Sequence, residues 1–268
     1  MWDGKSCTAI AKTFLGKGKK LASNTCHLCL ATPTLMNKPE VWDRPIILPE
    51  MVDYSCTVLH MWIRAMEYIF NLATKLPQDN RNKPLTSKEC QLTKLEMQAK
   101  FWIKLSLKLF MVKHGHGSTN NGNTRRNFFK KDPNMMASIL NIDPKIVIML
   151  ADLLDMFNDP ITKPSSDMFY RKARELFDLL TTPPLDIYPM PQSVHRFLCH
   201  GHIFIEQFEL PIGALSESAL EARNKFNRGA REHHARKTSM KDNVQDIFNH
   251  LLYTSDPYLF MKKQPKYV

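Results

Sequence analysis

Apolar side chains recur at three- and four-residue steps through most of this chain, and this period constrains the fold more than any other feature. In residues 52–75, for example, Leu59, Trp62 and Ile63 follow it. Such spacing places apolar side chains on one face of an α-helix. Further helices are expected at residues 88–113, 134–140, 144–158, 166–181, 192–208 and 244–252. We therefore predict a mainly α-helical fold with little sheet.

The helix expected at residues 88–113 carries two different faces. The residues expected to be buried are Leu92, Leu95, Ala99, Trp102, Leu105, Leu109 and Val112. Another face carries a basic ladder of Lys100, Lys104 and Lys108 at four-residue steps. A ladder of this kind is typical of a solvated face, and the alternative is a stripe that faces phosphates.

The chain is long enough and apolar enough to bury a substantial core. It has 268 residues, of which 43% are hydrophobic and 10% aromatic. This length suits one large domain or two modest ones. No apolar run approaches the roughly 18 residues that a membrane span needs, and residues 1–5 lack the apolar core of a signal peptide. We therefore expect an intracellular protein that does not enter a membrane.

Cys26 and Cys29 form the one close pair among six scattered cysteines, a pattern that argues against a disulfide framework. The Cys-x2-Cys spacing puts two thiolates on one tight loop, as a tetrahedral zinc ion requires, but it supplies only half a site. His195 and His200 are five residues apart, which is wrong for two ligands on one face of an undistorted helix. His195 and Cys199 fit that spacing better, so the residues alone leave the other ligands open.

A basic helix is expected after Pro211-Ile212-Gly213, with Ser216 or Ser218 as its cap. Seven Lys and Arg residues against one Glu lie between Arg223 and Lys241, in a chain whose formal net charge is +11. This balance favours polyanionic partners, with nucleic acid the first choice. Glu221 has two interpretations: it completes a Ser218-x-x-Glu221 capping box, or it holds a divalent cation beside a phosphate.

Two other segments lack helical periodicity. Residues 113–129 are rich in Gly and Asn and run on to Arg125 and Arg126. This composition suits either a flexible connector or an anion nest of exposed backbone amides. Residues 1–24 are expected to be irregular or hairpin-like, with Asp3-Gly4 as a surface turn.

The basic C-terminal segment resembles the last catalytic segment of the Transib transposases and of the V(D)J recombinase catalytic subunit derived from them. The shared residues are Gly213-Ala214, Glu221 three residues before Asn224-Lys225, then Arg228, Arg231, Ala235-Arg236 and Leu252-Tyr253-Thr254-Ser255. The resemblance extends over nearly the whole chain through the ordered series Asp3, Cys26-x2-Cys29, Asn121-Gly122-Asn123-x-x-Arg126, His195-x4-His200 and Glu221. One departure is Leu215, in a region where the vertebrate recombinase carries a Trp.

The resemblance implies a DDE enzyme that binds two metal ions in a ribonuclease-H-like fold. It implies that Asp3 and Glu221 are the second and third catalytic carboxylates, which hold Mg²⁺ or Mn²⁺. It also implies a structural zinc ion bound by Cys26, Cys29, His195 and His200. The candidate phosphate contacts are Arg125, Arg126, Arg223, Lys225, Arg228, Arg231 and Arg236.

The implied organisation has three parts. Residues 1–25 are a remnant of the nuclease core, residues 26–211 a zinc-clamped helical insertion, and residues 212–268 the catalytic-Glu helix and the C-terminal helices. The family's first catalytic Asp lies upstream of Asp3, and without it we expect no DNA cleavage by the isolated chain.

We expect a nuclear, transposase-derived DNA-binding protein and, by resemblance, a homodimer. The alternative is a non-enzymatic, zinc-stabilised helical module that binds DNA or a protein partner.

Overall fold

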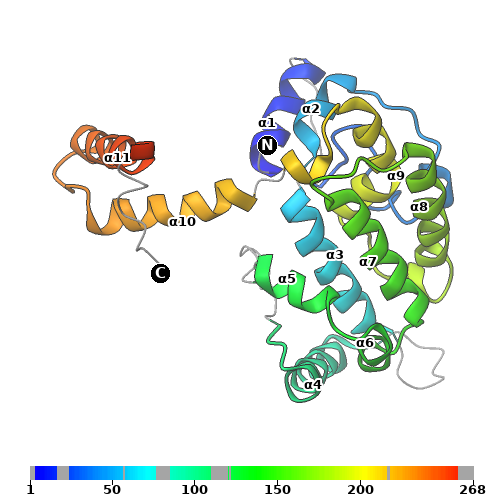
Figure 1. The fold of residues 1–268 in the computed structure, drawn as a ribbon. Helices are drawn as coiled ribbons and strands as arrows, with labels where there is room; N and C mark the ends of the chain where they lie inside the picture. Colours follow the sequence, from blue (N-terminus) through cyan, green and yellow to red (C-terminus); the bar gives the residue numbers. More distant parts are fainter. Residues whose placement is uncertain are drawn as a thin grey trace. The chain divides into compact units, whose positions relative to one another are not determined.

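The computed structural model describes residues 4–16, 24–56, 58–76, 85–109, 120, 122–215 and 218–258. These residues are mainly helical and include no strand, which confirms the helical class predicted from the apolar period. They fall into two compact units, Met1–Ser216 and Glu217–Val268. Figure 1 shows the helices of each unit.

Long helices that pack against α3 (Val58–Ala73) form the core of the first unit. The neighbours α7 (Pro144–Asn158), α8 (Ser166–Thr181) and α9 (Gln192–Gln207) pack in sequence order, and α3 contacts both α7 and α9 (Figure 1). Phe157, Phe169 and Phe197, one from each of these three neighbours, meet with ring centroids 5.4–5.5 Å apart. This aromatic contact fixes α9 on α8 and α7.

Local capping residues decide where α6 (Pro133–Leu140), α7 and α8 begin, and the predicted bounds agree with the observed ones to within one residue. Asp132 precedes Pro133 and accepts a hydrogen bond from Asn134 N, while Asp143 does the same for Lys145 N at 2.8 Å. An Asp followed by Pro suits a helix start because Pro needs no partner in the first turn.

The N-terminal region is more helical than predicted. Residues expected to be irregular form α1 (Gly4–Leu15), because Ala11 is fully buried and α1 packs beside the short helix η2 (Pro49–Met51). Tertiary contacts of this kind stabilise helices whose own periodicity is weak. The single helix expected at 52–75 is instead α2 (Val52–Ser55) and α3, separated by the extended backbone of Cys56.

The face of α4 (Ser87–Leu105) that meets the core is not the predicted one. Met97 and Phe101, which were not in the predicted set, are buried, whereas Leu92, Leu95 and Trp102 are 52%, 47% and 59% exposed. Leu105 is buried as expected, but the helix ends there and not at residue 113. Both faces of α4 are apolar, so the period alone did not decide between them. Leu109, in the segment after the helix, is buried as expected; Ala99 is exposed, and Val112 lies outside the described residues.

Among the described residues, α5 (Gly122–Phe129) forms in the segment that was expected to be a loop, because it packs against α3. The first unit also contains the short helices η1 (Pro39–Val41), η3 (Leu185–Ile187) and η4 (Ile212–Leu215). In the second unit, α10 (Ser218–His233) packs against α11 (Met240–Ser255), which is longer than the helix predicted at 244–252. The His250 ring of α11 stacks on Phe226 and on His234, with centroids 5.3 and 5.1 Å apart. These two stacks join the helices of this unit.

Candidate metal centre and basic surfaces

A tight loop holds the first two candidate ligands. The N–H of Leu30 donates to the carbonyl of Cys26 at 3.0 Å, and the N–H of Cys26 donates to the carbonyl of Ala31 at 2.9 Å. Leu30 has a φ of 55°, in the left-handed region, so the chain reverses directly after Cys29. The loop is therefore closed by its own backbone before any ion binds.

Helix α9 supplies the other two candidate ligands, and polar contacts tie it to the loop and to α2. The Gln192 side chain at its start donates to the carbonyl of Thr25, one residue before Cys26. Arg196, buried on the same helix, donates to the carbonyl of Ser55 at 2.7 Å. Gly201 lets α8 approach closely, because a Cβ there would lie 2.5 Å from the Phe169 ring. Nothing in the sequence marks Gln192 or Arg196 as supports of a site.

Cys26, Cys29, His195 and His200 meet in the interior of the first unit. One ligand atom from each lies within 4.8 Å of all the others, and every one of these residues is at most 2% exposed. Zn–S bonds of about 2.3 Å and Zn–N bonds of about 2.0 Å put neighbouring ligand atoms of a tetrahedral site roughly 3.3–3.8 Å apart. Cys29 Sγ and His195 Nε2 are 3.4 Å apart. The donor set and its spacing therefore fit zinc after a small contraction.

The charge balance of the group also suits a cation. Burial opposes ionisation of Cys26, but hydrogen bonds with Cys29, His195 and His200 outweigh it and lower the pKa of this thiol well below its usual value. The hydrogen bond with Cys26, together with burial, raises the pKa of Cys29. Burial lowers the pKa of His195 and so favours the neutral imidazole. A thiolate next to a neutral imidazole is what a metal ion requires of its ligands.

The five-residue spacing of the two histidines does not keep them apart. Their ring centroids are 5.1 Å apart and the rings are almost perpendicular. Five residues correspond to roughly 140° around a helix. An imidazole ring nevertheless extends far enough from the backbone for a nitrogen of His195 and a nitrogen of His200 to approach the same point. The objection drawn from helical spacing was therefore wrong.

The other histidines near the group have different partners. His27 lies between the two cysteines in the sequence, and its Nε2 is 3.1 Å from Thr8 Oγ1. Burial and then the charge of Arg196 lower its pKa to about 4. His202 packs its ring edge-on against Tyr170, with centroids 4.9 Å apart. The converging ligand group contains neither of them.

The catalytic role expected for Asp3 and Glu221 remains a prediction. Asp3 lies outside the described residues. The backbone of Glu221 belongs to α10, but its side chain, like those of Arg223 and Lys225, lies outside the described part of the structure. Both interpretations of Glu221, the capping box and the cation ligand, remain open.

Arg125 and Arg126 differ in exposure although they are adjacent. Arg125 lies three residues before Phe128, on the face of α5 that packs against α3, and is 1% exposed with its guanidinium 5.0 Å from the centre of the Trp62 ring. An external phosphate does not reach a side chain in that position. Arg126 is exposed, so the phosphate contact expected from this pair falls to Arg126.

The described arginines of the second unit also divide into two kinds. Arg228 and Arg231 are exposed on α10. Arg236 makes a two-pronged ion pair with Asp246 of α11, with Nε–Oδ2 and Nη2–Oδ1 distances of 2.9 Å. Arg236 therefore has a structural partner in this conformation, and a phosphate would have to compete with it.

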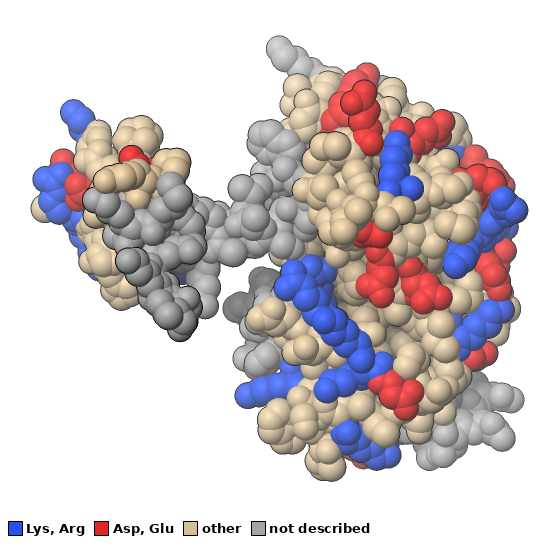
Figure 2. Space-filling view, viewed as in Figure 1, with Lys and Arg blue, Asp and Glu red and all other residues tan. Residues whose placement is uncertain are grey.

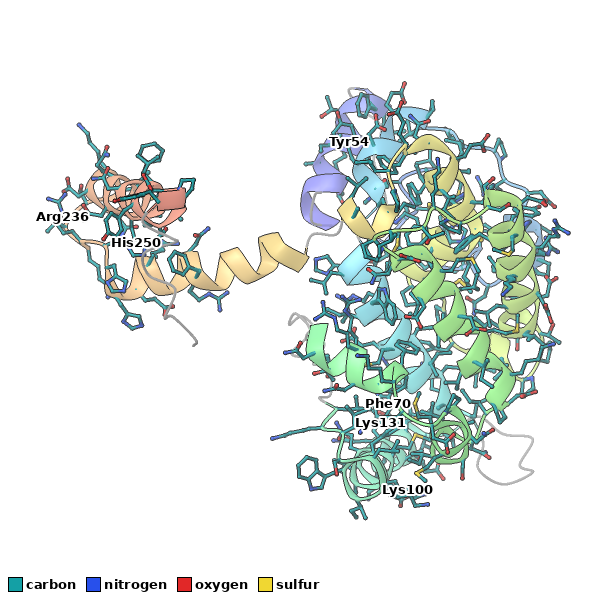
Figure 3. All side chains as sticks on the ribbon, in the orientation of Figure 1. Tyr54, Phe70, Lys100, Lys131, Arg236 and His250 are labelled. Carbon is teal, nitrogen blue, oxygen red and sulfur yellow. The ribbon has the colours of Figure 1, made fainter. Side chains whose placement is uncertain are left out.

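Basic side chains also gather on the first unit. Figure 2 shows Lys and Arg over α4 and α5 on the face in view. The exposed basic residues of these elements and of the turn after α5 include Lys100, Lys104, Arg126 and Lys130, and these four are called the α4–α5 basic surface below. Figure 3 labels Lys100 of α4 and Lys131 in the turn after α5. Lys100 and Lys104 of the predicted ladder are thus exposed on α4, whereas Lys108, also exposed, lies in the segment after the helix ends at Leu105.

Comparison with known proteins adds no relative. No protein-family model and no curated protein matches this sequence. None of the described helices combines the length and the apolar character needed to span a bilayer. The interpretation of the chain therefore depends on its own motifs and geometry.

Proposed function

We propose that this chain is a zinc-stabilised, DNA-binding part of a transposase-derived protein of the Transib type. The observation that supports this most is the convergence of Cys26 and Cys29 with His195 and His200. These residues belong to the ordered series of motifs that resembles the family. A structural zinc site needs four suitable ligands that meet in a buried position. Here two of them come from each end of a helical region.

The zinc ion in this proposal acts on the fold. Four protein ligands complete a tetrahedral shell, so the ion has no open position for a substrate and supplies a cross-link. That link closes a loop between Cys29 and His195, which are 166 positions apart. Linking distant segments offsets the large loop-closure entropy that their contact costs. The loop and α9 would thereby hold the helices between them.

The nuclease chemistry is a separate part of the proposal. Asp3 and Glu221 would hold Mg²⁺ or Mn²⁺ in a ribonuclease-H-like core, where the ions activate water and stabilise the leaving oxygen. The structural zinc group takes no part in that reaction. Nuclear location and a homodimer follow from the same family resemblance.

Double-stranded DNA is the proposed partner. Arg228 and Arg231 in the second unit and the α4–α5 basic surface in the first offer exposed cations, in a chain of net charge +11. Contacts between such side chains and phosphates supply sequence-independent affinity through the release of counterions. Arg236, in the segment between α10 and α11, is instead paired with Asp246 of α11, and Arg125 packs over Trp62 of α3.

The exposed face of α4 favours a second candidate, a module that also binds a protein. Leu92, Leu95 and Trp102 are each about half exposed or more, and Ile103 is 78% exposed. Apolar side chains at these helical steps form a stripe that water solvates poorly, and a partner helix covers such a stripe in many complexes.

Zinc content tests the main proposal directly. We expect one zinc ion per purified chain, and none in Cys26→Ala or His200→Ala, with increased protease sensitivity of residues 24–215 in both variants. Cys90→Ala is the matched control, because Cys90 lies on α4, outside the ligand group. A zinc-free wild-type protein, or zinc content unaffected by His200→Ala, would contradict the proposal.

A further inference from the structure

The ring of His195 lies between two sulfur atoms. Its Nε2 is 3.4 Å from Cys29 Sγ, and its Nδ1 is 3.4 Å from Cys199 Sγ. All three residues are at most 2% exposed. His195 and Cys199 are four residues apart on α9, so they lie on the same face, one turn from each other. Each nitrogen of this imidazole therefore has its own sulfur neighbour.

The two nitrogens have different surroundings. Nε2 points to Cys29, a member of the converging ligand group, whereas Cys199 does not belong to that group. A zinc ion at the centre of the group would therefore take Nε2. A neutral imidazole then carries its proton on Nδ1, directed at Cys199 Sγ. A metal-binding histidine usually donates its second N–H to an acceptor that fixes the ring.

We propose that Cys199 is a positioning residue, which accepts the Nδ1–H hydrogen bond of His195 and holds Nε2 toward the zinc ion. The inference rests on the proposed zinc site. The acceptor is unusual, since a carboxylate, a carbonyl or a water commonly takes this place. A sulfur can take this place because Cys199 Sγ lies 3.4 Å from Nδ1 and both residues are at most 2% exposed.

Three variants separate hydrogen bonding from packing. Cys199→Val keeps an apolar side chain but removes the acceptor, and Cys199→Ser keeps an acceptor. Cys90→Val is the control for loss of a thiol elsewhere. Zinc affinity would be measured by competition with a chromogenic chelator. We expect it to fall about 10- to 100-fold in Cys199→Val, the effect typical of losing such a partner, with substantial recovery in Cys199→Ser and no change in Cys90→Val.

Cobalt substitution distinguishes positioning from direct ligation. The thiolate-to-cobalt absorption of the Co²⁺-loaded protein reports how many sulfurs bind the metal. We expect two thiolates in the wild type and an unchanged spectrum in Cys199→Val. A spectrum that loses one thiolate in this variant would identify Cys199 as a ligand and overturn the proposal.

The tautomer of His195 provides a test that needs no variant to fold. Long-range ¹H–¹⁵N correlation spectra of the zinc-bound wild type should show a proton on Nδ1 and the metal on Nε2. The reverse assignment, or unchanged zinc affinity in a folded Cys199→Val, would rule out the positioning role while leaving the zinc site intact. A wild type that binds no zinc would instead contradict the proposed function itself.

Discussion

Adjacent arginines have different surroundings in this protein because one face of α5 is buried and the other is not. Arg125 packs its guanidinium over Trp62, whose own ring meets Phe129 at 5.3 Å. Arg126, one position later, has turned by about 100° into solvent. Two adjacent basic residues therefore need not both be available to an external partner.

We predict that Arg125→Ala destabilises the first unit, whereas Arg126→Ala leaves its stability almost unchanged. Removing a buried cation from an aromatic face, together with its packing, should cost about 2 kcal/mol or more. An exposed substitution such as Arg126→Ala usually changes stability by about 0.5 kcal/mol or less. Urea unfolding followed by circular dichroism measures both.

DNA binding should show the opposite order. We expect Arg126→Ala to weaken binding of a generic duplex, and Arg125→Ala to leave it unchanged under conditions where the variant stays folded. Equal loss of affinity in the two variants would show that burial of Arg125 does not determine its role.

Among the helices, the pairing of α10 with α11 depends on a polar clamp as well as on stacked rings. Asp246 accepts from both the side chain and the backbone N–H of Arg236, with all three distances at 2.9 Å. Figure 3 labels Arg236 and His250, the residues through which the clamp and the ring stack are made. The hydrogen bonds from the Arg236 side chain and then from its backbone lower the pKa of Asp246 to about 2.

This clamp predicts an acid-sensitive helix pair. The folded pKa of about 2 lies below the unfolded value of about 3.9. The carboxylate therefore stabilises the folded pair above about pH 4, and this contribution disappears as the pH falls through 2. Carbon-13 NMR titration of Asp246 should give a midpoint near 2 in the wild type and a higher one in Arg236→Gln.

Arg231→Gln is the matched control for that titration, since Arg231 is exposed on α10 and is not among the groups that shift the pKa of Asp246. Its titration curve should coincide with that of the wild type. A midpoint near 3.9 in the wild-type protein would mean that the clamp does not form in solution.

Taken whole, the molecule distributes exposed positive charge over both units, and each phosphate contact made with DNA should contribute to the salt dependence of binding. We predict that the double variant Arg228→Ala/Arg231→Ala lowers the magnitude of the slope of log Kobs against log salt by about 1.8. The reason is that each lost phosphate contact removes about 0.9 from this slope. Fluorescence anisotropy of a labelled duplex at several salt concentrations measures it.

The control removes two exposed lysines from a different part of the protein. Lys163 lies just before α8 and Lys172 lies on it, and both are exposed. Lys163→Ala/Lys172→Ala therefore changes the net charge by the same amount as Arg228→Ala/Arg231→Ala. Its slope should stay close to that of the wild type. Equal slopes in both double variants would indicate that net charge, rather than contact by α10, governs binding.

The sequence by itself determined the helical class and the bounds of α6, α7, α8 and α9. Apolar steps of three and four residues require one buried helix face, and cap residues such as Asp132 and Asp143 act on amides two residues away. These interactions are local, so they can be read along the chain. The resemblance, and not the spacing of the residues, supplied all four members of the converging ligand group.

Only the tertiary structure decided the features that depend on distant neighbours. It buried Met97 and Phe101 of α4 in place of Leu95 and Trp102, placed Arg125 against α3, and gave α1 a surface to fold on. It also brought His200 beside His195 despite their spacing and placed Cys199 at the second nitrogen of His195. Helical periodicity records which side chains share a face, and the packing of distant segments determines what each face meets.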